Sequence, residues 1–260
     1  MTAILRAESR RRVRGPTYLI IVLWIFTALY FAMFPGFAEE AEEIADAFPE
    51  YIFDLFGLEA LHTIEGFIAA ELYSFFWSLL VAIYFAYISA GMIAGDVETR
   101  KLDLTLSNPI SRESVLLQKV ASLWVPLVIL NVGLAAPVYI GSVVIGETMN
   151  PVAIAMVHLL SIPYLLVCAA IGLLLSVTLK HVRTARSAAF GLVILLWLVD
   201  AFSRLHEDFE WVGAFTPSRY WEEADILVHE EYAFVDAGLL LVVFFVLIGI
   251  ALFIFIRRDI

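Results

Sequence analysis

The 260-residue sequence is poor in the two residue types that build most metal and redox sites. Cys168 is its single cysteine, which excludes an intramolecular disulfide and a cluster of thiolate ligands. The five histidines include no pair four residues apart on one predicted helix, so the usual spacing of a histidine metal site is absent. We therefore predict no metal site, and we interpret Cys168 and His158 as packed residues.

Charge is also scarce, since 17% of the residues are charged and 62% are hydrophobic. There is no dense basic patch of the kind that binds nucleic-acid phosphates, so we expect no nucleic-acid partner. Gly141 and Gly146 have the spacing of a phosphate loop, and Glu147 and Thr148 follow, but Glu147 stands where the required Lys would be. We interpret the two glycines as packing or turn residues and expect no cofactor in this chain.

Long apolar runs are abundant. A helix needs roughly 20 residues to cross a hydrocarbon core about 30 Å thick. The continuous apolarity of these runs favours helices over the strands of a barrel, in which apolar and polar residues alternate. The predicted fold class is an all-α polytopic membrane protein with six transmembrane helices and short interfacial helices. The six runs are residues 17–34, 67–94, 120–145, 152–179, 185–202 and 235–256.

Basic residues occupy every second gap between these runs. Five precede the first run, four follow the second, three follow the fourth and two follow the last, whereas the other gaps hold only Arg204 and Arg219. The positive-inside rule then predicts that both termini are cytoplasmic. We expect a multi-pass protein of the cell membrane.

Acidic residues gather on the predicted outer side. The net charge is -11, and by this topology 2 basic and 21 acidic residues lie outside, against 14 and 6 inside. An acidic exterior is typical of a host adapted to high salt, which we favour, or of a vestibule that attracts cations. The basic inner rim would hold anionic lipid headgroups.

Two outer segments are long enough to have structure of their own. Residues 38–66 mix acidic and apolar side chains, which predicts either an amphipathic helix on the membrane surface or a packed lid. Residues 203–234 contain Pro217, Tyr220 and Trp221, and such aromatic rings prefer the headgroup level. We interpret this stretch as an outer re-entrant segment.

The inner gap at residues 95–119 carries the most specific pattern. Charged residues open it, Leu102, Leu104 and Leu106 follow, and Pro109 ends that stretch before Ser111 caps the next helix. Three leucines exposed to the cytoplasm beside charges indicate a surface that docks a soluble partner.

This pattern resembles the first cytoplasmic loop of ABC-2-type ABC transporter permeases. That loop reads as an acidic pair, a spacer, Leu-Asp/Glu-Leu-x-Leu-Ser-x-Pro and then Ser/Thr-Arg. A Gly-Thr pair that often precedes the first Leu of the family pattern is Arg100-Lys101 here. The residues that match are Asp96, Glu98, Leu102, Asp103, Leu104, Leu106, Ser107, Pro109, Ser111 and Arg112.

The resemblance covers the whole chain, including a basic amphipathic stretch at residues 1–16, and implies a single permease domain at residues 1–260. In the family this loop docks on a separate ATPase that binds ATP and Mg. By resemblance, residues 98–107 are the docking element and Arg112 braces the loop. A second permease copy or paralogue, the lipid bilayer as surroundings, export as the direction and no enzymatic activity in this chain are also implied.

Two other function classes fit the same helices. An intramembrane enzyme would use Glu71 and Asp200, but both lie near predicted outer helix ends where water can solvate them. A non-transporting scaffold or sensor would use the acidic outer segments. Asn131 and Ser161 are expected to join helices by hydrogen bonds rather than to line a pathway.

Overall fold

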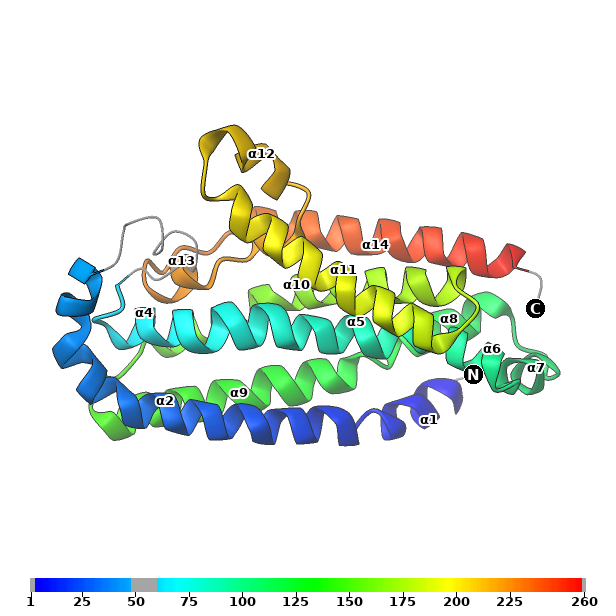
Figure 1. Cartoon of the computed structure of the whole chain (residues 1–260). Coiled ribbons are helices and arrows are strands. Elements are labelled where there is room, and N and C mark those ends of the chain that lie inside the picture. The colour runs from blue at the N-terminus through cyan, green and yellow to red at the C-terminus, as the bar shows by residue number, and fades with distance from the viewer. Residues whose placement is uncertain (1–2, 48–59, 259–260) are drawn as a thin grey trace.

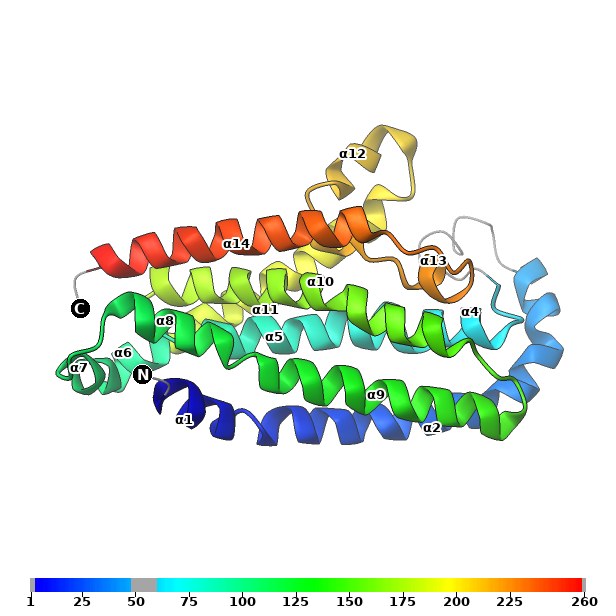
Figure 2. The ribbon, with the colours of Figure 1, turned by 180° about the vertical axis from the view of Figure 1, so that it is seen from behind.

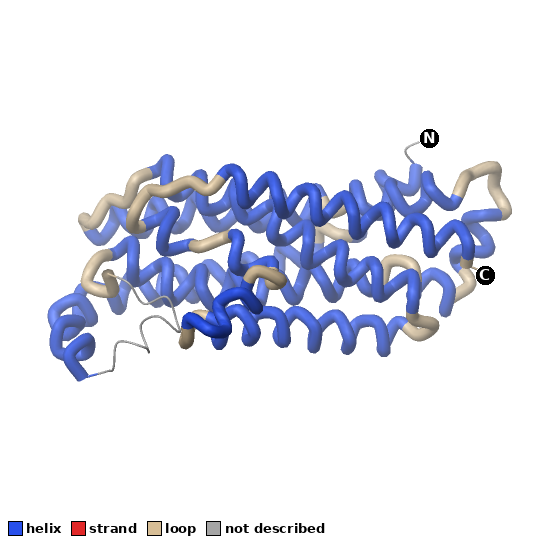
Figure 3. The backbone as a smooth tube through the Cα atoms, turned by 90° about the horizontal axis from the view of Figure 1, so that it is seen from above, coloured by secondary structure: helices blue, strands red, loops and turns tan. Residues whose placement is uncertain are grey.

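The computed structural model describes residues 3–47 and 60–258, with the side chains of residues 39–47 and of Glu207 outside the description. That part of the chain holds helices and no strand (Figure 3). The helices are α1 (Ala3–Arg11), α2 (Arg14–Ala47), α4 (Ile64–Ile68), η1 (Ala69–Val81), α5 (Ala82–Ala90), α6 (Ala94–Glu98), α7 (Lys101–Leu106), α8 (Arg112–Ala121), α9 (Trp124–Ile145), α10 (Pro151–Thr178), α11 (Val182–Ser203), η2 (Glu207–Phe209), α12 (Glu210–Gly213), η3 (Pro217–Tyr220), α13 (Glu223–Leu227) and α14 (Phe234–Arg257).

Six helical stretches of the described chain are long and apolar enough to cross a membrane, which confirms the predicted number and the all-α fold class. They are Ala3–Ala38, Ile64–Glu98, Arg112–Ile145, Pro151–Thr178, Val182–Ser203 and Phe234–Arg257.

Helix α10 forms the centre of the bundle. In its most apolar 18-residue window 72% of the residues are buried, against 22% to 28% in the stretches that contain α2, α9, α11 and α14. It packs against α5 and α14 and also touches α9 and α11, while α2 lies along α9 at one edge (Figure 1). An all-round apolar helix belongs at such a central position, and the outer helices expose apolar faces for lipid.

Helices α5 and α10 approach each other closely at Gly172. A Cβ added there would overlap the carbonyl oxygen of Ala86, so only glycine fits. Ser89, Ala90 and Ala94 on the same span are also buried within the chain. These small residues therefore serve packing inside one subunit.

The second span is less regular than predicted. Its residues 67–94 were expected to form one helix, but η1 is a 13-residue π-helix and a turn at residues 91–93 separates α5 from α6. Stretches of π-helix are rare and usually far shorter.

The first span continues beyond its predicted end at residue 34. Helix α2 includes Pro35 and runs to Ala47. Its last turns are rich in Ala and Glu, which are strong helix formers even where the sequence is no longer apolar. The two alternatives for residues 38–66, a surface helix or a lid, also concern residues 48–59, which lie outside the described residues.

The predicted cap at Ser111 is confirmed, and Asn150 caps another helix in the same way. The side chain of Asn150 accepts a hydrogen bond from the Val152 amide at the start of α10, and Ser111 accepts one from the Ser114 amide at the start of α8. Gly146 ends α9 with a φ of +85°, and a Cβ on Gly141 would overlap the ring of Phe31, so these glycines are turn and packing residues.

Both ends of the chain lie at the same end of the bundle, beside α6, α7 and the start of α8 (Figures 1 and 2). We call this the basic end, because residues 6–14, which run from α1 to the start of α2, carry five arginines there. The opposite end, which carries α4 and α13, we call the acidic end.

Candidate functional site

Helices α6 and α7 form a short projection at the basic end, and they contain most of the residues of the family-like pattern. The chain reverses between them at Arg100, which has a left-handed φ of +55°. This is the position where the family pattern often has Gly, the residue that adopts such a conformation without steric cost.

The three leucines of α7 do not share one environment. Leu102 is fully buried, Leu106 is partly buried, and Leu104 is 72% exposed. The prediction of three exposed leucines is therefore wrong for Leu102, because residues four apart face the same side of a helix and Leu102 and Leu106 face the bundle. Asp103 and Leu104 occupy the exposed side.

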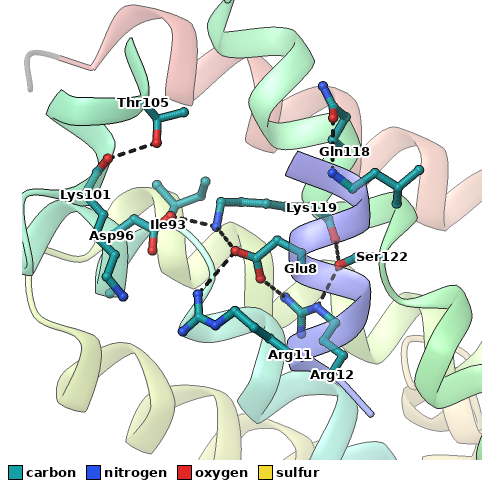
Figure 4. A network of polar contacts seen from close by, with 12 residues as sticks. Glu8, Arg11, Arg12, Ile93, Asp96, Lys101, Thr105, Gln118, Lys119 and Ser122 are labelled. Atoms are coloured by element: carbon teal, nitrogen blue, oxygen red, sulfur yellow. Dashed lines mark hydrogen bonds and ion pairs between the residues drawn. The ribbon is translucent and has the colours of Figure 1, made fainter. Parts of the chain in front are cut away.

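Asp96 contributes to an internal ion-pair network (Figure 4). Its Oδ2 lies 2.7 Å from Nζ of Lys119 on α8, and the same Nζ lies 3.3 Å from Oε1 of Glu8 on α1. Lys119 is only 3% exposed. A buried ammonium needs such partners, because an unpaired charge away from water is costly.

Helix α1 is fastened to α8 by further contacts. The amide of Leu5 donates to Oε1 of Gln118 at 3.1 Å, and Nε of Arg12 donates to Oγ of Ser122 at 2.7 Å. The basic amphipathic stretch therefore packs on the span that follows the loop. The pairing of Glu8 with Lys119 was not predicted from the sequence, because both residues were only counted as charges when the topology was assigned.

Glu98 links the projection to α11. Its Oε2 accepts a hydrogen bond of 2.9 Å from the amide of Val182, the first residue of that helix. The first N–H groups of a helix have no partner within it, so the Glu98 carboxylate caps α11 from another part of the chain.

Arg112 joins the start of α8 to the end of α14. Its guanidinium donates to the carbonyl oxygens of Phe255, Ile256 and Arg258 at 3.3, 3.1 and 2.6 Å. It therefore braces α8 against the end of α14, because it lies in the first turn of α8 facing the carbonyl groups that end α14. Its bracing of residues 98–107 stays a prediction.

A second set of contacts ties this end to α10. Arg258 donates to the carbonyl oxygens of Val177 and Leu179 at 2.8 and 3.1 Å. Oγ of Ser176 accepts hydrogen bonds from the amides of Ile93 and Ala94 at 2.9 and 3.0 Å. The start of α6 is therefore held by the last turn of the central helix.

At the acidic end, the predicted outer residues lie against the bundle. Pro217 begins η3, and the Tyr220 hydroxyl donates to the Ala214 carbonyl at 2.7 Å. The Trp221 ring is 3% exposed, stacks on Tyr164 at 5.8 Å between centroids and donates its N–H to the Val157 carbonyl at 3.1 Å. The segment thus seats one aromatic anchor on α10.

Asp200 is not solvated as expected. It is 6% exposed, and its Oδ2 lies 3.1 Å from Arg204, which also pairs with Glu222 at 2.8 Å. Burial raises the pKa of Glu222, although Arg204 opposes that shift, and burial raises the pKa of Glu223 to about 7. Glu71 shares a hydrogen bond with Tyr30.

The other expectations for buried polar residues are confirmed. Nε2 of His158 lies 2.9 Å from the Tyr73 hydroxyl, and Oγ of Ser161 donates to Oδ1 of Asn131 at 3.2 Å. Cys168 is buried. Among the described side chains, which are those of residues 3–38 and 60–258 except Glu207, no three of His, Cys, Asp or Glu gather as metal ligands, and the absence of a metal site stays a prediction.

Comparison with known proteins agrees with this architecture. No curated protein matches the sequence. A family model described as "ABC-2 family transporter protein" matches residues 2–260, which is nearly the whole chain. Six spans, and a loop pattern carried on α6, α7 and α8, fit the membrane component of an ABC transporter. The chain belongs to the ABC-2 transporter family, as a permease subunit.

Proposed function

We propose that this permease couples to a separate ABC ATPase through the projection formed by α6 and α7. The observation that carries the proposal is the division of α7 into two faces. Leu102 is buried, whereas Leu104 is 72% exposed and Asp103 beside it is exposed as well. An exposed apolar side chain next to a charge, on an anchored short helix, suits a docking contact with a soluble protein.

The anchoring of the projection supports a role in transmitting force. Asp96 joins α6 to α8 and, through Lys119, to α1; Glu98 joins it to α11; and Ser176 joins it to α10. A displacement of α7 would therefore act on several spans at once. This suits a transition of the hinge or shear type, in which packed helices move as rigid elements.

The rest of the proposal follows the family resemblance. The basic end would face the cytoplasm, where the partner ATPase would bind ATP and Mg. ATP-driven closure of the ATPase would then move the docked projection. A second permease, identical or a paralogue, would complete the membrane part, and the direction of transport would be export. The positive-inside distribution of Lys and Arg supports this orientation.

The test is affinity purification of the full-length chain from its host in mild detergent, with bound proteins identified by mass spectrometry. The variant Asp103→Arg, Leu104→Asp alters the exposed face of α7 only. The matched control Asp208→Arg reverses an exposed carboxylate beside α12, away from α7. We expect an ATPase with the native chain and the control, and its loss with the double variant.

Two results would count against the proposal. An ATPase retained by the double variant would place the contact elsewhere. A monodisperse native chain that recovers no ATPase would favour a scaffold or sensor instead, for which changes on α7 should be tolerated.

A further inference from the structure

A cavity of about 280 Å³ lies at the basic end between α1, the start of α2, the α5–α6 turn and α11. One part of its wall is charged and another part is apolar. The charged residues are Glu8, Arg11, Arg12, Asp96, Lys119 and Arg186. The other lining residues are Gly15, Tyr84, Ile88, Gly91 and Met92.

The charges on this wall do not balance. Lys119 uses both carboxylates, at 2.7 Å from Asp96 and 3.3 Å from Glu8. Arg11 and Arg12 approach the same Glu8, at 3.5 and 3.9 Å. Three cations thus share two carboxylates, and Arg186 is a fourth cation in the same lining, so the cavity has an excess of positive charge.

Arg186 is the cation without an acidic partner. Its guanidinium lies over the ring of Tyr87, 4.7 Å from the centroid, and its buried Nε has no hydrogen-bond partner among the described residues. It also lies directly across Gly91, where a Cβ would be 2.7 Å from Nη2. The ring and the glycine hold the guanidinium in place, so little side-chain freedom is left for a ligand to remove.

We propose that this cavity binds a phosphate group, carried by the headgroup of an anionic phospholipid, with Arg186 as its principal contact. A planar guanidinium recognises phosphate oxygens with two parallel hydrogen bonds. Basic pockets between spans at the cytoplasmic side are typical sites for anionic headgroups. The apolar wall formed by Tyr84, Ile88 and Met92, with the exposed Tyr87 beside it, offers the acyl chains a path to the bilayer.

This site is independent of ATPase docking, because none of its contacts involves the exposed face of α7. A lipid here would bridge α1 and α11 across the turn that begins α6. It would thus stabilise the frame of the projection without touching the docking surface.

The test uses the full-length chain in detergent and native mass spectrometry, with phosphatidylglycerol and phosphatidylcholine as the two lipid probes. The variant Arg186→Gln removes the charge, Arg186→Lys keeps the charge without the fork, and Arg183→Gln is the control on the exposed side of α11. We expect phosphatidylglycerol to bind the native chain and the control equally, and Arg186→Gln about tenfold more weakly, as befits one charged hydrogen-bonding group.

A thermal-shift measurement with inorganic phosphate alone separates the two sources of a phosphate group. Stabilisation by phosphate in delipidated protein, lost in Arg186→Gln, would keep the phosphate site but assign it to a soluble anion. Equal binding of both lipids, or unchanged phosphatidylglycerol binding by Arg186→Gln, would overturn the proposal. If Arg186→Gln does not purify as a folded protein, Arg186→Lys decides, since it should bind phosphatidylglycerol more weakly than the control.

Discussion

Nζ of Lys119 lies 2.7 Å from Oδ2 of Asp96, so a buried cation of α8 holds the acidic residue that opens the family-like pattern. The same cation reaches Glu8 of α1 at 3.3 Å. A residue matched to a docking pattern is thus part of the internal frame that positions the docking helix. On α7, Asp103 and Leu104 are exposed and are not part of this frame.

We expect Lys119→Met to destabilise the protein by about 3 kcal/mol, because it leaves two largely buried carboxylates without their shared partner. The measurement is thermal unfolding of the purified chain in detergent, followed by tryptophan fluorescence. Lys101→Met, at an exposed position on α7, is the control and should change stability by less than about 0.5 kcal/mol. Equal effects of the two substitutions would contradict the network.

Arg100→Gly should stabilise the turn between α6 and α7 by about 1 kcal/mol, since a residue with a side chain is strained at a φ of +55°. Lys101→Gly, one residue later in the first turn of α7, should have the opposite sign, because glycine disfavours a helix. Hydrogen exchange of the amides of α7 measures both. Slower exchange in Lys101→Gly than in Arg100→Gly would refute the expectation.

Glu223 should make stability depend on pH. Burial raises its pKa to about 7 from an ordinary value near 4.5, and Arg204 and Ser74, which favour the charged form, offset only part of this. The folded state therefore holds the proton more tightly than the unfolded state, so this group lowers stability as pH rises from about 4.5 to about 7, with no further change above that.

The measurement for Glu223 is the midpoint of thermal unfolding at several values of pH. Glu223→Gln should weaken the decline between pH 4.5 and 7, whereas Glu210→Gln, at an exposed position on α12, should leave it as in the native chain. Glu222 also has a pKa raised by burial, so part of the decline should persist in Glu223→Gln.

Trp221→Phe should cost about 1 kcal/mol of stability, because the phenyl ring keeps an apolar contact with Tyr164 but loses the hydrogen bond from the indole N–H to the Val157 carbonyl. Trp211→Phe is the matched control, since Trp211 is 66% exposed. Chemical denaturation in detergent compares the two. A larger loss for Trp211→Phe would show that the outer segment is not anchored through Trp221.

The number of spans could be predicted from the sequence because the thickness of the membrane sets the length of each apolar run at about 20 residues, whatever the helix packs against. The sequence also predicted the cap at Ser111, which depends on neighbouring residues. The π-helix η1 was not predicted. A continuously apolar sequence does not distinguish the hydrogen bonds of an α-helix, to the fourth preceding residue, from those of a π-helix, to the fifth. The partners of Lys119 and Arg112 were missed because they come from distant parts of the chain. The burial of Asp200 was missed because packing between elements creates it.

The contact between Gly172 and Ala86 limits how this permease can move. If α10 slid by one turn along α5, Ala169 or Ser176, which lie on the same face as Gly172, would bring a Cβ against the backbone of α5 where none can fit. Helices α5 and α10 must therefore move together as a rigid unit. During a transport cycle the surrounding helices would rotate about the contact between α5 and α10, and these two helices would not slide along each other.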